Sequence, residues 1–216
     1  LKRRVIRRIY DHPEVREAAT RAIDEFGTSC TGSRYLNGTL RLHEELEERL
    51  AAFAGQEAAL VYSTGFQTNL GLLATLCGKD DVILADRDNH ASLVDGCRLS
   101  FAKTRKYGHA DMAHLRECLA AAGSGDKLIV TDGVFSMSGE IAPLPGICDL
   151  AEEFGAAVMV DDAHGIGVLG PGGTGTAAHL GVASRIDIVM ATDDDSLRRA
   201  ASDSLSTTSL GTCPGW

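Results

Sequence analysis

The chain has 216 residues, of which 44% are hydrophobic, enough for one large domain with a buried core. Its 21 basic and 30 acidic residues give a net charge of −9, which excludes a basic nucleic-acid surface and polybasic membrane attachment. No apolar run approaches the roughly 20 residues of a membrane helix, and the six cysteines show neither disulfide nor metal spacing, so we expect a soluble, cytoplasmic protein without a metal site.

Two amphipathic helices are expected at the start of the chain. Asp11 and Pro13 supply a capping residue and an early proline, and apolar residues follow at helical spacing as far as Phe26. A loop rich in Gly, Ser and Thr at 27–39 ends this helix. The second helix carries one apolar stripe, formed by Leu42, Leu46, Leu50 and Phe53.

From there, apolar runs alternate with helical patterns such as 111–122 and 143–154. The expected strands are 58–62, 82–85, 103–107, 127–131, 156–160 and 186–191. This alternation predicts an α/β fold with a mostly parallel sheet covered by helices on both faces, a three-layer arrangement. We expect an N-terminal segment and helix at 1–26, the large domain at 27–192, and a loosely ordered, Ser-, Thr- and Asp-rich tail at 193–216.

The segment Ser63-Thr64-Gly65-Phe66 joins an expected strand to a helix. The amides at a helix start and the helix dipole favour an anion, and Gly65 lets the backbone approach it closely, so this turn can bind a phosphate. A strand, a glycine and a helix also occur together for topology alone.

Asp161 and His164 follow the apolar run V-M-V, and His90 begins a helix after the run D-V-I-L-A. Ligands of open α/β sheets bind outside the carboxyl ends of the strands, so these side chains lie where a cofactor is expected. Alone, His90 fits a helix cap or a surface position, and Asp161 fits a cap or a salt bridge. The histidines at 12, 43, 109, 114 and 179 share no metal-ligand spacing.

The run G-I-G-V-L-G at 165–170 matches the dinucleotide fingerprint G-x-G-x-x-G. A genuine fingerprint turns directly from a strand into a helix, whereas D-D-A-H precedes this run and P-G-G-T-G follows it. We therefore expect neither a nicotinamide nor a flavin cofactor here.

Five motifs in order carry a resemblance: G-S-R-Y-L-N-G-T, Y-S-T-G-F-Q-T-N, D-R-D-N-H-A-S-L, T-D-G-V-F-S-M-S-G-E and V-M-V-D-D-A-H-G. Together they resemble the α-oxoamine synthase family of pyridoxal-phosphate enzymes over 11–192. The resemblance implies an incomplete large domain of fold type I and pyridoxal 5'-phosphate (PLP) as cofactor. It also implies decarboxylative condensation of a small amino acid with an acyl-CoA, and a homodimer.

The resemblance assigns three residues to catalysis. His90 matches the histidine that stacks on the pyridine ring and orients the substrate carboxylate. Asp161 matches the aspartate that keeps the pyridine nitrogen protonated, so that the ring can absorb carbanion charge. His164 matches a group beside the phenolic oxygen of the cofactor.

Four further residues are implied as cofactor contacts. Gly65 and Phe66 match the family's backbone contact to the phosphate, and Thr192 matches the threonine that bonds it. Ser136 matches a group around the ring and its phenolic oxygen.

The chain departs from the family at the residue that forms the Schiff base. That lysine lies three residues after the threonine, and here the position holds Asp195, while Lys127 is the last lysine of the sequence. Truncation, a frameshift or degeneration would each account for this. The alternatives are a non-catalytic pseudoenzyme that serves as an interaction subunit, and an aminotransferase of the same fold.

Overall fold

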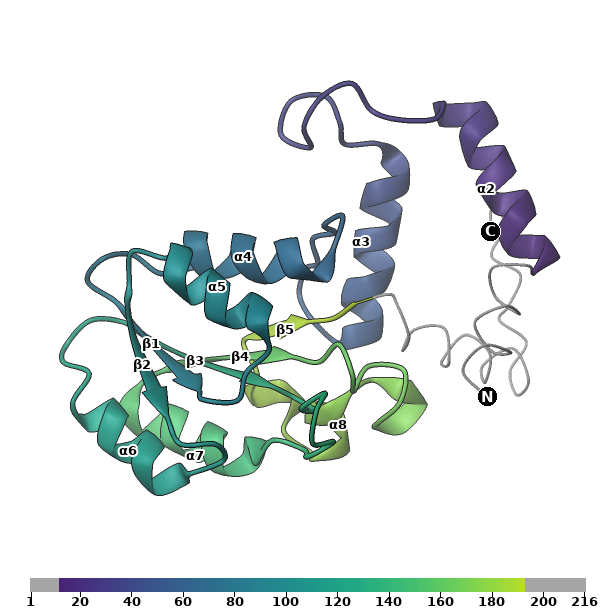
Figure 1. The fold of residues 1–216 in the computed structure, drawn as a ribbon. Coiled ribbons are helices and arrows are strands. Elements are labelled where there is room, and N and C mark those ends of the chain that lie inside the picture. Colours follow the sequence, from purple (N-terminus) through teal and green to yellow (C-terminus); the bar gives the residue numbers. More distant parts are fainter. Residues whose placement is uncertain (1–11, 193–216) are drawn as a thin grey trace. The chain divides into compact units, whose positions relative to one another are not determined.

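The computed structural model describes residues 12–192 (Figure 1). The chain divides into two compact units that meet in the sequence between Val61 and Tyr62. The sequence predicted a single large domain over 27–192, whereas the structure places 27–61 with the first helices. The expected tail at 193–216 and the capping residue Asp11 lie outside the described residues.

The first unit contains helices α2 (Pro13–Phe26) and α3 (Arg41–Ala54), close to their predicted bounds. The strand expected at 58–62 is not formed. Side chains satisfy the backbone there instead: the Val61 amide donates to Glu47 at 2.8 Å, and the Arg34 guanidinium donates to the Val61 carbonyl at 3.2 Å. An apolar run predicts burial, but a strand also needs a partner strand to pair with its backbone.

The second unit is built around a five-stranded, wholly parallel sheet in the order β2-β1-β3-β4-β5. The strands are β1 (Val82–Asp86), β2 (Lys103–Tyr107), β3 (Lys127–Asp132), β4 (Ala157–Asp161) and β5 (Ile188–Met190). The longer helices are α4 (Gly65–Leu76), α5 (Ala91–Leu99), α6 (Met112–Ala120) and α7 (Leu144–Phe154), with the short α8 (Thr176–His179) before β5. The predicted α/β fold and its sheet are confirmed.

Side chains of successive strand residues enter two separate cores. In β1, Leu84 joins the core that contains Leu115 of α6 and Ile147 of α7, while Ile83 joins the core that contains Leu93 of α5. This alternation is the period of two expected for an extended chain whose two faces are both covered. The sheet is therefore the middle of three layers, with α4 and α5 on one face and α6 and α7 on the other (Figure 1).

Among residues 12–192, no helix is both long enough and apolar enough to cross a membrane. The glycine-rich run at 165–170 lies in turns, and a short 3-10 helix at Pro171–Gly173 follows it. The strand-to-helix turn of a dinucleotide fingerprint is thus absent from this stretch, as its context predicted.

Candidate cofactor site

Three neighbouring strands end on an aspartate: Asp86 in β1, Asp132 in β3 and Asp161 in β4. Each strand runs one residue further than its apolar run predicted, and Asp132 and Asp161 lie side by side in the ladder. Burial, and then the charge of Asp161, raise the pKa of the Asp132 carboxyl to about 7. The carboxyl edge of the sheet therefore concentrates buried acids at one place.

A cavity of about 410 Å³ opens at this edge, a volume in the range of small-molecule sites. Six of the seven residues predicted for the site line it: Gly65, Phe66, His90, Asp161, His164 and Thr192. They come from four separate stretches of the chain, and all lie within the second unit. The structure therefore brings together residues that lie more than 120 positions apart.

Asp161 forms the buried end of the cavity, with 4% of its surface exposed. Its Oδ2 accepts a hydrogen bond from Asn69 Nδ2 at 2.7 Å, and its Oδ1 accepts one from the Ala163 amide at 3.2 Å. A buried carboxylate needs such donors, and each oxygen retains a further lone pair for a ligand.

Another part of the wall is the start of α4. Thr64 caps this helix by accepting from the Gln67 amide at 3.2 Å, and the first intrahelical bond runs from the Thr68 amide to the Thr64 carbonyl. The amides of Gly65 and Phe66 precede that bond, at the positive end of the helix dipole. A Cβ atom at position 65 would overlap the Thr192 Cγ2 atom, so a larger residue there would displace the Thr192 side chain.

His90 is the N-cap of α5, and its Nδ1 accepts from the Ser92 amide at 3.3 Å. The helix-cap interpretation and the cofactor interpretation of this histidine are therefore compatible, because the capping ring also lines the cavity. His164 lies exposed in the turn that follows β4.

Ser136 is the exception among the seven predicted residues. It is exposed in the turn after β3 and is not among the residues that line the cavity. The turn is closed by hydrogen bonds from the Gly139 amide to the Phe135 carbonyl at 2.7 Å and from the Phe135 amide to the Glu140 carbonyl at 2.9 Å.

Asn69, Ser92 and Asp132 were not predicted as site residues, although all three are buried, Ser92 and Asp132 line the cavity, and Asn69 contacts Ser92 and Asp161. Asp132 had a signal, because the run L-I-V-T-D ends as the run V-M-V-D does. Asn69 and Ser92 stand within the motifs Y-S-T-G-F-Q-T-N and D-R-D-N-H-A-S-L, but nothing in those motifs shows that the two side chains meet, which depends on the packing of α4 and α5.

Two further groups of polar residues hold loops near the site. His109 bridges Asp86 and Glu140 at 3.0 Å each and contacts the Phe135 ring edge-on. Burial lowers the pKa of His109, but its hydrogen bonds to Asp86 and Glu140 outweigh burial and raise it overall. These contacts join the end of β1 to the turn after β3, which carries Ser136.

Asp162 is the second of these groups, 1% exposed and enclosed by glycines. Its carboxylate accepts from the Thr176 amide at 2.7 Å and from the Thr176 hydroxyl. A Cβ atom at Gly165 would overlap both Asp162 and Thr176. Burial raises the pKa of Asp162 to about 6. The glycines of 165–170 thus include one that permits close packing on a buried carboxylate.

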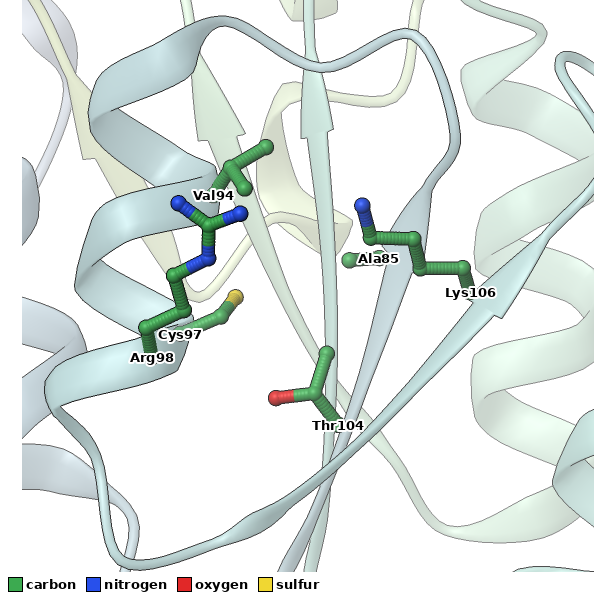
Figure 2. A pocket seen from close by; sticks show the side chains of 6 residues that line it. All are labelled: Ala85, Val94, Cys97, Arg98, Thr104 and Lys106. Carbon is green, nitrogen blue, oxygen red and sulfur yellow. The ribbon is translucent and has the colours of Figure 1, made fainter.

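A second cavity, of about 430 Å³, lies between α5 and the edge strand β2 (Figure 2). Its lining residues are Ala85, Val94, Cys97, Arg98, Thr104 and Lys106. Arg98 is paired with Asp95 at 2.9 Å, and burial raises the pKa of the Cys97 thiol, which makes it a poor nucleophile. None of the predicted site residues lies here.

A buried carboxylate and a helix start around one cavity, at the carboxyl edge of a parallel sheet, are the features of a ligand site in an open α/β protein. The model of the family "aminotransferase class I and II" matches residues 9–193, and the chain belongs to this family.

Two groups of named relatives are similar to this chain. A serine palmitoyltransferase of Bacteriovorax stolpii is 54% identical over 183 residues, which are 84% of this chain and 44% of that protein. An 8-amino-7-oxononanoate synthase of Geobacter sulfurreducens is 51% identical over 183 residues, 84% of this chain and 47% of that protein. The chain thus spans under half the length of these relatives.

Solved structures give the same two groups. A serine palmitoyltransferase of Sphingomonas wittichii superposes with a TM-score of 0.83 at 42% identity, covering 87% of this chain and 47% of that one. An 8-amino-7-oxononanoate synthase of Francisella tularensis gives 0.66 at 30% identity, covering 83% and 47%. The resemblance to α-oxoamine synthases and the fold type I architecture are confirmed. A further similar structure, a serine palmitoyltransferase of S. paucimobilis with a TM-score of 0.83 at 39% identity, covering 87% of this chain and 48% of that one, carries a bound PLP aldimine.

Proposed function

We propose that this chain holds PLP in the cavity between the carboxyl end of β4 and the N-terminal start of α4. The observation that carries the proposal is the meeting of Asp161 with the start of α4 around one cavity of about 410 Å³. PLP bears a basic ring nitrogen and a phosphate, and the chain offers a buried carboxylate for the first and helix amides for the second. The close approach that Gly65 permits fits a phosphate held by backbone.

In this proposal, Asp161 accepts a hydrogen bond from the protonated ring nitrogen, and the amides of Gly65 and Phe66 bind the phosphate beside Thr192. His90 lies against the ring and orients a substrate carboxylate, while His164 meets the phenolic oxygen. Ser136 would reach the cofactor only after movement of its turn. When bound, PLP supplies an electron sink for negative charge that develops on the substrate.

The activity proposed for the whole protein is decarboxylative condensation of a small amino acid with an acyl-CoA, in a cytoplasmic homodimer. Support comes from the relatives, which are named as a palmitoyltransferase and an oxononanoate synthase. The amino acid and the acyl chain are set by residues that this site does not define.

One observation favours a second function, a binding subunit without catalysis of its own. The family's Schiff-base lysine position holds Asp195, and residues 128–216 contain no lysine. An aspartate cannot attack the cofactor aldehyde as an amine does. Position 195 lies outside the described residues, so this argument rests on the sequence.

Equilibrium dialysis with PLP tests the binding proposal, with the Asp161→Ala variant and an Asp24→Asn control on the exposed face of α2. We expect binding by the wild type and by the control, and at least tenfold weaker binding by Asp161→Ala, because a charge-assisted hydrogen bond is lost. Equal binding by all three proteins would overturn the proposed site.

Borohydride reduction and peptide mapping then separate the enzyme from the binding subunit. A lysine covalently joined to PLP after reduction, together with CoA release from acyl-CoA and an amino acid, supports the enzyme. PLP that binds without any trapped lysine supports the subunit. The Asp195→Lys variant should gain trapped cofactor at position 195, with Asp193→Lys as its control.

A further inference from the structure

A chain of hydrogen bonds, buried except at its His90 end, links Asp161 and His90, which both line the proposed cofactor cavity. Asn69 Nδ2 donates to Asp161 Oδ2 at 2.7 Å and to Ser92 Oγ at 2.9 Å. Ser92 Oγ lies 2.7 Å from His90 Nδ1. Asn69 and Ser92 are 0% and 1% exposed, so water does not compete for the bonds of Asn69 to Asp161 and Ser92, whereas His90 is exposed and its bond to Ser92 is partly buried.

The charge of Asp161 fixes the orientation of the Asn69 amide. Turned the other way, the amide would set its oxygen against a carboxylate oxygen, and two acceptors would be in contact. In the observed orientation, Asn69 Oδ1 has no hydrogen-bond partner among residues 12–192 although it is fully buried. A buried acceptor without a partner is costly, so the two donations from Nδ2 must outweigh that cost.

The direction of the last bond is set at His90 Nδ1. Because Asn69 Nδ2 can only donate, Ser92 Oγ accepts from it, but a hydroxyl can also accept a second bond, so its 2.7 Å contact with His90 Nδ1 is compatible with either direction. The Ser92 amide is a fixed donor and points to the same Nδ1, at 3.3 Å. A nitrogen that accepts from this amide carries no hydrogen, so the Ser92 hydroxyl donates to Nδ1 as well.

We propose that Asn69 and Ser92 are positioning residues that transmit the charge of Asp161 to His90 and fix that ring as the tautomer protonated on Nε2. Asn69 does not line the cavity, and Ser92, which does, acts in this proposal through its bond to His90. This inference rests on the proposed function for its use in the site, because an Nε2–H group is the donor that His90 would present to a substrate carboxylate.

Nitrogen-15 NMR of histidine-labelled protein without cofactor reads the tautomer directly, at pH 8.5, where an ordinary imidazole is neutral. In the wild type, we expect His90 Nδ1 to show the nitrogen-15 chemical shift of a ring nitrogen that carries no hydrogen. The Asn69→Leu and Ser92→Ala variants should each lower the ratio of the Nε2–H to the Nδ1–H form, by roughly tenfold for the loss of one hydrogen bond. Ser184→Ala, an exposed site, is the matched control and should leave the ratio unchanged.

The Asp161→Asn variant tests the transmission itself. Asp161 does not touch His90, and its neutral amide would let Asn69 turn and accept from Ser92, so the same ratio should fall. Substitution of a residue that only supports packing would leave the ratio of the two His90 tautomers unchanged. If Asn69→Leu proves unfolded by circular dichroism, Ser92→Ala, which removes a single atom, decides the matter.

The outcomes separate this inference from the proposed function. A dominant Nδ1–H form in the wild type, or a ratio unchanged in Ser92→Ala and Asp161→Asn, would overturn the relay even if PLP binds. The converse result is that the tautomer ratios are as expected while equilibrium dialysis shows no PLP binding. That result would overturn the proposed function but support the hydrogen-bond relay.

Discussion

The Asp132→Asn variant should make the protein more stable at alkaline pH and leave it nearly unchanged in acid. Burial and the adjacent Asp161 raise the pKa of the Asp132 carboxyl from 3.8 to about 7. The folded protein therefore binds this proton more tightly than the unfolded chain does. The stability that it contributes is fully present below pH 3.8 and is lost as the pH rises through about 7.

The size of the effect follows from the same shift. Between pH 5 and pH 7 the folded state holds a proton that the unfolded state has released, so the free energy of unfolding falls by about 1.4 kcal/mol per pH unit, on the order of 3 kcal/mol in all. Asparagine keeps an acceptor for the His90 amide, which donates to Asp132 at 2.7 Å, but does not titrate.

Urea unfolding followed by circular dichroism, at pH 5.0 and pH 8.5 without cofactor, measures this difference. We expect the free energy of unfolding of the variant, relative to wild type, to rise by on the order of 3 kcal/mol from pH 5.0 to pH 8.5. The exposed Asp24→Asn control should differ from wild type by the same amount at both pH values. A variant whose stability differs from wild type by the same amount at both pH values would refute the assignment of a neutral Asp132.

Three further predictions concern packing and charge near the site. Gly65→Ala should weaken PLP binding at least tenfold in equilibrium dialysis, because its Cβ would overlap a threonine methyl, whereas the control Gly78→Ala, with no neighbour closer than 3.6 Å, should bind normally. Gly165→Ala should lower the free energy of unfolding by roughly 1–3 kcal/mol in urea, because its Cβ would overlap the enclosed Asp162. His109→Gln should destabilise more at pH 5.5 than at pH 9, since the raised pKa of His109 gives stability below that pKa and loses it above; equal losses would contradict the ion bridge.

The parallel sheet was predictable because its inner strands β1, β3 and β4 have the apolar pattern that a covered sheet requires, whereas the edge strand β2 is mostly charged and exposed. The run L-I-V-T of β3 has no charged residue and is buried along its length, which no amphipathic helix would allow. The segment 58–62 has a similar composition, yet side chains from Arg34 and Glu47 satisfy its backbone. Composition reports burial, and strand pairing depends on partners elsewhere in the chain.

Three site residues were predictable from one topological rule, that parallel strands deliver the residues at and after their carboxyl ends to the same edge of a sheet. Asp161 ends β4, His164 follows it, and His90 lies four residues after β1. Gly65 and Phe66 begin α4 after a segment that forms no strand, and Phe66 and Thr192 were implied only by the family resemblance. The rule says nothing of how far a turn projects from that edge. Ser136 follows β3, but hydrogen bonds within its turn leave it on the surface.

The relay shows which part of a site such a rule cannot reach. Asn69 lies 92 residues from Asp161 and 23 from Ser92, and although it ends the motif Y-S-T-G-F-Q-T-N, the motif does not show which side chains it meets. Its position follows from the packing of α4 on α5, where a Cβ atom at Gly96 would press on the Asn69 carbonyl at 2.8 Å. Because Gly96 permits that approach, the amide can reach both partners at once. The groups that meet a ligand are therefore set by strand order, whereas the groups that set their protonation are placed by contacts between the helices above them.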